Sequence, residues 1–118
     1  MKKFPIVASM IAITVIFYNC HSAKKATSSV PPPPPYTYET NLKVVIAASC
    51  SPCHISGKGN KKPYDNFANV KTDIDEMIRR IQLNPSDKGF MPFRKAAKLS
   101  DSTIAVFTKW KADGLIEK

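Results

Sequence analysis

The stretch that decides the fold is residues 50–54, which read Cys-Ser-Pro-Cys-His. It places two thiols three positions apart and an imidazole directly after the second thiol. The residues that lead into it, 42–49, have apolar side chains at helical spacing and contain neither proline nor glycine. We therefore expect a first helix that runs into Cys50 and presents both thiols from its end.

This motif predicts covalent attachment of haem. A Cys-x-x-Cys-His run is the attachment signature of c-type haem. Each thiol adds to one vinyl group of the porphyrin, and the adjacent histidine becomes the proximal ligand of the iron. Two cysteines three positions apart on the end of a helix reach the two neighbouring vinyls. Cys50 and Cys53 are therefore predicted to bind one haem c, and His54 is predicted to bind its iron.

Two other chemistries use similar residues. Cys-x-Pro-Cys is also the active motif of thioredoxin-like thiol oxidoreductases, and the apolar residues 44–46 could form a strand before it. That fold needs a βαβ unit with further strands, whereas here a proline-rich segment precedes the motif, and helices and loops are expected after it. A zinc site would need a second pair of ligands, and the only other histidine, His21, lies outside the expected domain.

The first third of the 118-residue chain differs from the rest. Lys2 and Lys3 precede an apolar run over residues 4–18, which is the layout of an export signal. The run is shorter than the about 20 residues that a membrane-spanning helix needs. We predict a signal peptide over residues 1–19, and an uncleaved anchor is the alternative.

Cys20 follows the apolar run, and the segment FYNC resembles a bacterial lipoprotein cleavage box. The resemblance implies that Cys20 is lipidated and becomes the first residue of the mature chain. Phe17 and Asn19 depart from the usual leucine and small residue of that box. The alternative is a spare thiol at the end of an anchor, and both alternatives tether the domain to a membrane.

Residues 20–35 are predicted to be an extended tether, because they are small, polar and proline-rich and end in five consecutive prolines. Loss of Lys2 and Lys3 with the signal lowers the formal charge from +9 to +7. This basic balance favours acidic redox partners or an anionic membrane surface. Nucleic acid is not expected, because the basic residues are spread over several segments and the protein is predicted to be exported.

Residues 36–118 are predicted to form one all-α domain. Ile74, Met77, Ile78 and Ile81 follow the helical i, i+3, i+4, i+7 rule. Three further local signals set the expected ends of the helices after the motif. They are a capping box of Thr72 and Asp75, a stop at Leu83-Asn84-Pro85, and a last helix that begins at Ser100, turns Ile104, Phe107 and Trp110 inward and stops at Gly114. Irregular stretches are expected over about residues 56–69 and 85–98.

A haem iron held by one histidine needs a sixth ligand or an open position. Met77 lies on the apolar stripe of a helix, where methionine is usually core filler. Met91 lies in the irregular segment Gly89-Phe90-Met91-Pro92, in which glycine would allow close backbone approach. We therefore predict Met91 as the second iron ligand.

The order of helix, Cys-x-x-Cys-His, loop, helix, Met-Pro loop and aromatic-bearing last helix resembles the small class I cytochromes c of bacteria over about residues 40–115. The resemblance implies three to four helices wrapped around one haem, with Met91 facing His54 across the iron. It implies an electron carrier and no enzyme, because a six-coordinate iron favours electron transfer over oxygen chemistry. The alternative is a haem peroxidase or gas-binding protein with an open sixth position.

The expected location is the periplasmic side of a bacterial membrane, with a lipid anchor at Cys20. Two groups of basic residues could surround the exposed haem edge and meet an acidic partner. They are Lys58, Lys61 and Lys62 after the haem motif, and Arg94, Lys95 and Lys98 after Met91. The alternative is that these residues belong to a generally solvated basic surface.

Overall fold

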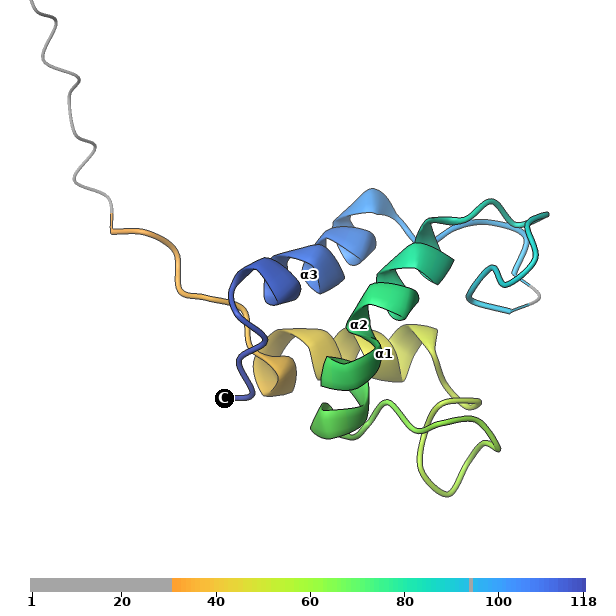
Figure 1. Ribbon diagram of the computed structural model, residues 1–118, viewed down its shortest axis with the longest axis horizontal. Coiled ribbons are helices and arrows are strands. Elements are labelled where there is room, and N and C mark those ends of the chain that lie inside the picture. The colour runs from red at the N-terminus through yellow and green to blue at the C-terminus, as the bar shows by residue number, and fades with distance from the viewer. Residues whose placement is uncertain (1–30, 94) are drawn as a thin grey trace, which may run out of the picture. The chain divides into compact units, whose positions relative to one another are not determined.

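The computed structural model describes residues 31–93 and 95–118. Their regular structure is helical and comprises η1 (Tyr38–Leu42, a π-helix), α1 (Lys43–Ser49), α2 (Phe67–Gln82) and α3 (Asp101–Ala112) (Figure 1). These residues contain no strand, only an isolated parallel bridge between Thr37 and Ile116. The expectation of a helical domain is therefore confirmed. Among the described helices, none is long and apolar enough to cross a membrane.

The predicted signal over residues 1–19 and the predicted lipidation site Cys20 lie outside the described residues, as does most of the predicted tether over 20–35. Residues 31–35 are exposed prolines without regular secondary structure. The signal and the lipid anchor therefore stay predictions.

The first helical segment leads directly into the cysteine motif, as expected. It begins where the Thr37 hydroxyl accepts a hydrogen bond from the Thr40 amide, and η1 continues into α1 without a break. Leu42 and Ile46, four residues apart, are fully buried. Cys50 follows the last residue of α1, and its amide donates to the Ile46 carbonyl over 2.8 Å. The motif thus begins at the carboxyl end of a helix.

Helix α2 begins five residues before the predicted capping box, so that prediction is wrong. Asn66 is the actual cap, and its side chain accepts a hydrogen bond from the Asn69 amide over 3.1 Å. Thr72 lies inside the helix, where its hydroxyl donates to the Ala68 carbonyl one turn earlier. A threonine can satisfy its hydroxyl in this way in mid-helix, so its presence alone did not mark the helix start.

Helix α3 joins the two ends of the domain. Its predicted ends are confirmed, because Ser100 caps the first turn and Gly114 follows the helix with a φ of +100°. The Trp110 ring nitrogen donates to the Ile116 carbonyl over 2.7 Å, and the Tyr38 amide donates to the same carbonyl over 2.8 Å. The carboxyl-terminal segment is thereby tied to the start of η1.

The core lies where η1, α2 and α3 meet. The predicted apolar positions of α2 and α3 point inward, because Phe107 and Trp110 are fully buried and Met77 is only 6% exposed. Phe67 packs edge-on against Trp110, with ring centroids 6.2 Å apart, and against Tyr38 at 5.7 Å. Such edge-to-face pairs stabilise beyond their buried area. The two long loops, residues 50–66 and 83–99, lie outside this core on the same side of the helices (Figure 1).

Candidate functional site

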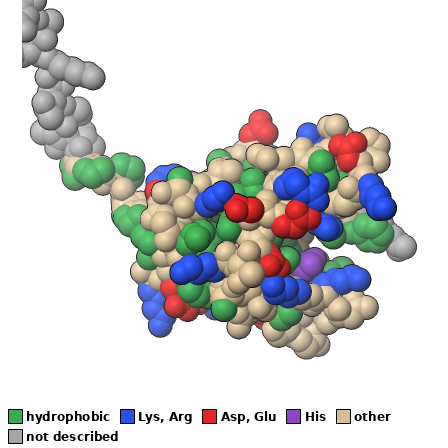
Figure 2. Space-filling model, viewed as in Figure 1, with side chains coloured by type: hydrophobic (Ala, Val, Ile, Leu, Met, Phe, Trp, Pro, Cys, Tyr) green, Lys and Arg blue, Asp and Glu red, His purple; other side chains and the backbone are tan. Residues whose placement is uncertain are grey.

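The two long loops and the face of α2 between them enclose a cavity of about 1020 Å³. This volume is at the upper end of the range of about 300–1,000 Å³ found for small-molecule and cofactor sites. A hollow in the surface is visible at the right of the space-filling view, with histidine and Lys or Arg colours at its edge (Figure 2). Cys50, Cys53, His54 and Met91 all line this cavity. The four residues predicted as a site therefore line one cavity, although about 40 residues separate the motif from Met91.

His54 has a defined tautomer in this arrangement. Its Nδ1 lies 2.8 Å from the backbone carbonyl of Lys62. A carbonyl only accepts, so Nδ1 carries the proton and Nε2 of the neutral ring keeps its lone pair. Histidines that bind metals almost always donate their other ring N–H to a carbonyl or carboxylate, which orients the ring. The hydrogen bond to Lys62 thus prepares Nε2 of His54 to bind a metal.

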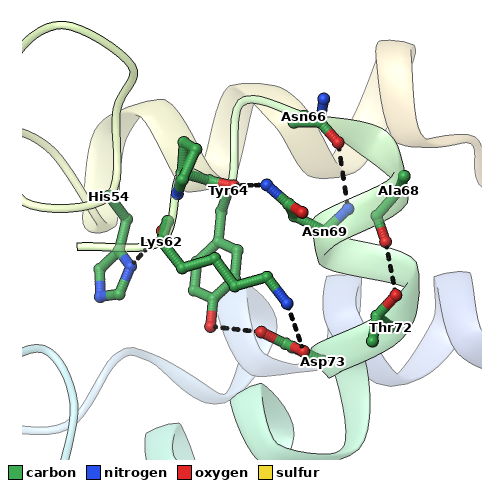
Figure 3. A network of polar contacts seen from close by, with 9 residues as sticks. His54, Lys62, Tyr64, Asn66, Ala68, Asn69, Thr72 and Asp73 are labelled. Atoms are coloured by element: carbon green, nitrogen blue, oxygen red, sulfur yellow. Dashed lines mark hydrogen bonds and ion pairs between the residues drawn. The ribbon is translucent and has the colours of Figure 1, made fainter.

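A tyrosine and an aspartate complete the surroundings of this imidazole (Figure 3). The Tyr64 ring stacks on the His54 ring, with centroids 4.6 Å apart and planes within 7°. The Tyr64 hydroxyl donates to Asp73 on α2 over 3.2 Å, and the Lys62 ammonium pairs with the same carboxylate at 2.8 Å. Burial and the Asp73 charge raise the pKa of Tyr64 to about 12, so its hydroxyl remains a hydrogen-bond donor at neutral pH.

The loop after His54 folds back on the motif through its backbone. The Lys61 amide donates to the Cys53 carbonyl over 3.2 Å, and the Tyr64 amide donates to the His54 carbonyl over 2.8 Å. Gly59 makes this possible, because a Cβ at this position would overlap the backbone carbonyl of Cys53. A side chain at position 59 would therefore push the loop away from the cysteine motif.

Both cysteines of the motif are free thiols, and Cys50 is partly buried whereas Cys53 is exposed. Burial raises the pKa of Cys50 to about 11, so its thiol is protonated at neutral pH. Cys50 also follows the carboxyl end of α1, where the negative end of the helix dipole disfavours a thiolate. These conditions are the opposite of those that activate a catalytic cysteine, which are a helix amino end or nearby positive charge.

Two methionines line the cavity. Met77 belongs to the buried face of α2 and also packs in the core, whereas Met91 is partly exposed in the loop after α2. The Met91 amide donates to the Arg80 carbonyl over 3.2 Å, which ties this loop to the last turn of α2. Gly89 is needed for its φ of +94°, and a Cβ there would meet only arginine side-chain ends at 3.9 Å. Among the protein atoms of the described residues nothing therefore approaches the Gly89 backbone closely, and the expected close approach at this segment stays a prediction.

Charged side chains also line the cavity. Of the basic residues expected around it, Lys61, Lys62 and Lys95 line it, Lys58 and Lys98 do not, and Arg94 lies outside the described residues. The remaining charged lining residues were not predicted from the sequence. They are Arg80, Lys88, Asp73, Glu76 and Asp87. Glu76 forms ion pairs with both Arg79 and Arg80 at 2.7 Å, which lowers its pKa to about 2.

Tyr64 and Asp73 were not among the predicted site residues, and they lie 10 and 19 positions after the motif histidine. No spacing rule connects them with His54, because their contact depends on the irregular loop between α1 and α2. In the part of the chain that the structure describes, no three His, Cys, Asp or Glu side chains gather into a metal site. Compared with protein-family models, with curated proteins and with solved structures, the chain has no match.

Proposed function

We propose that this protein is an electron carrier that binds one covalent haem c, with Cys50 and Cys53 as attachment points and His54 and Met91 as iron ligands. One observation carries the proposal. His54, the last residue of the Cys-x-x-Cys-His motif, donates its Nδ1 proton to the Lys62 carbonyl on the wall of a cavity that both cysteines and Met91 also line. When bound, haem supplies an iron that takes up and releases one electron.

The cavity suits a large, flat, mostly apolar group with two acidic arms. Phe90, Phe107, Leu99 and Ile81 give it apolar walls. Lys61, Lys62, Lys88, Lys95 and Arg80 also line it, and their cations are the groups that bind carboxylates. This combination supports haem as the occupant and a cytochrome c-like arrangement of the helices around it.

The chain's own residues would set the properties of the site. His54 keeps Nε2 available because the Lys62 carbonyl holds its other nitrogen, and Met91 offers a neutral thioether from the opposite loop. Methionine and histidine together raise a reduction potential and leave no open position for oxygen. These features favour electron transfer without turnover of a substrate.

A thiol oxidoreductase is disfavoured by the position of the motif. The nucleophilic cysteine of such enzymes has a lowered pKa, commonly at a helix amino end. Here Cys50 follows the carboxyl end of α1, and burial raises its pKa to about 11. The βαβ unit of that fold is also not found in residues 31–93 and 95–118.

We further propose that the protein is exported and anchored by a lipid at Cys20 on the periplasmic side of a bacterial membrane. Its redox partner would present an acidic surface. The support for this partner is the basic balance of the chain, with 18 Lys+Arg against 9 Asp+Glu, and the lysines at the cavity, Lys61, Lys62, Lys88 and Lys95. An exposed Phe93, 65% accessible beside the cavity, adds apolar contact area at this surface.

Visible spectra of the oxidised and reduced protein, recorded with and without carbon monoxide, test the carrier function. The proposal predicts low-spin, six-coordinate spectra in both oxidation states and no change on adding carbon monoxide. A reduced spectrum that shifts at once with carbon monoxide would instead support the haem peroxidase or gas-binding alternative, in which Met91 leaves the sixth position open.

A further inference from the structure

Four residues form one network at the imidazole of the haem motif, namely His54, Lys62, Tyr64 and Asp73, and of these Lys62 and Tyr64 contact the imidazole (Figure 3). Lys62 makes two of these contacts. Its backbone carbonyl accepts the His54 Nδ1 proton, and its side-chain ammonium pairs with Asp73 at 2.8 Å. Tyr64 also makes two contacts. Its ring stacks on His54, and its hydroxyl donates to Asp73. Asp73 thus holds both residues that contact the imidazole.

Among the residues that the structure describes, only the backbone carbonyls of Pro63 and Tyr64 in the segment that carries these contacts have hydrogen-bond donors on η1 and α2. The Tyr38 hydroxyl donates to the Tyr64 carbonyl over 3.0 Å, and the Asn69 side chain donates to the Pro63 carbonyl over 2.9 Å. The backbone at residues 63 and 64 is therefore held by η1 and α2, whereas the hydroxyl end of the Tyr64 side chain is held by Asp73. This arrangement restrains the histidine in two ways, because a hydrogen bond fixes one ring edge and a parallel ring covers one face.

We propose that Asp73 and Tyr64 are positioning residues that fix the ring plane of His54 from helix α2. This inference rests on the proposed function, because a fixed ring plane has a chemical consequence only when Nε2 binds iron. The Lys62–Asp73 ion pair is partly exposed, with side-chain exposures of 43% and 24%, and such pairs contribute little to stability. The contribution of Asp73 and Tyr64 is instead to orient the His54 ring as a metal ligand.

The ring plane of a histidine ligand, together with the orientation of the second ligand, sets which haem methyl groups carry unpaired spin in the ferric protein. Proton NMR of these methyls therefore reports the orientation of His54. A second signal, the exchange of the His54 Nδ1 proton with solvent in the diamagnetic reduced protein, reports how firmly the Lys62 carbonyl and the Tyr64 ring protect it. Loss of stability alone does not change the order of the methyl shifts, but it can speed exchange of a protected proton through opening of the fold, so the exchange rates are compared at equal free energy of unfolding.

The experiment compares Tyr64→Leu, Tyr64→Phe and Asp73→Ala with Asp75→Ala in the full haem-loaded protein. Asp75 is the matched control, because it lies on the same helix and also pairs with a lysine, Lys111, but does not line the cavity. Tyr64→Leu and Asp73→Ala should reorder the methyl shifts and speed Nδ1 proton exchange by about tenfold, which corresponds to about 1.4 kcal/mol. Tyr64→Phe keeps the stacked ring, so its shift should be in the same direction but smaller. Asp75→Ala should match the wild type.

The positioning role is overturned when Tyr64→Leu and Asp73→Ala lower the melting temperature but leave both NMR signals as in the wild type. Equal changes in Asp75→Ala would also overturn it. Failure of the proposed function gives a different result, because the purified wild type would then carry no haem. In that case nitrogen-15 spectra of the same sample still report whether Nδ1 of His54 is protonated and whether Tyr64→Leu and Asp73→Ala change this.

Discussion

Replacing the two cavity methionines by leucine separates the iron ligand from the core residue. Leucine has nearly the same volume as methionine but no sulfur, so a well-packed site tolerates the change at less than about 1.5 kcal/mol. Met91→Leu should abolish the weak near-infrared sulfur-to-iron band of the oxidised protein and leave the haem attached. It should also lower the reduction potential, because a thioether favours ferrous iron. Met77→Leu should keep both the band and the potential.

The burial of the two methionines predicts that truncating Met77 lowers the free energy of unfolding more than truncating Met91. Met77 is 6% exposed within the core cluster, so Met77→Ala should cost about 2–5 kcal/mol through the cavity that it creates. In a domain of this size each kcal/mol lowers the melting temperature by about 4–8 °C, so a fall of at least about 8 °C is expected. The partly exposed Met91 buries less surface, and truncating it should cost less than about 2 kcal/mol of packing.

Near-infrared absorption, potentiometry and thermal unfolding of these variants check the assignment. Loss of the band in Met77→Leu with its retention in Met91→Leu would refute the reasoning and move the ligand to α2. Retention of the band in both variants would show that its sulfur comes from neither methionine.

Three further predictions concern the loop, alkaline pH and the lipid anchor. Gly59→Ala should displace the loop from the Cys53 carbonyl and lower the free energy of unfolding by about 1–3 kcal/mol. It should also reduce the fraction of chains that carry haem, which intact mass measures. Normal stability and normal haem loading would contradict this prediction. The pKa values of Tyr38 and Tyr64 are raised from 10.0 to about 12, mainly by burial. The stability that these neutral phenols contribute is complete below pH 10 and should be lost as the pH rises toward 12; a flat unfolding free energy over this interval would refute it. Cys20→Ala should abolish acylation, and mass spectrometry of a mature chain that begins elsewhere would contradict the anchor.

The helices and the core could be predicted because local periodicity determines them. Leu42 and Ile46 lie one turn apart and are both buried, and Phe107 and Trp110 follow the same rule on α3. The end signals were reliable where backbone geometry demands a particular residue, as at Gly114 with its φ of +100°. They failed at Thr72, because a hydroxyl can cap a helix or bond back to a carbonyl inside one.

The site was only half predictable for a related reason. Cys50, Cys53 and His54 are adjacent in sequence, so their shared chemistry is visible before any folding. Tyr64 reaches the imidazole, and brings Asp73 near it through its hydroxyl, only because the loop returns to the motif through backbone bonds such as that from the Tyr64 amide to the His54 carbonyl. No residue pattern in the sequence predicts that this loop returns to the motif. The loop can approach the Cys53 carbonyl closely only because Gly59 has no side chain.

The intact mass of the protein purified from cells that attach c-type haem, measured under denaturing conditions, tests the central claim most directly. Thioether bonds survive denaturation, so the account predicts a polypeptide heavier by one haem. It also predicts that changing both Cys50 and Cys53 to alanine removes this added mass. A wild-type chain at the bare polypeptide mass, or lighter by two hydrogens from a Cys50–Cys53 disulfide, would contradict it.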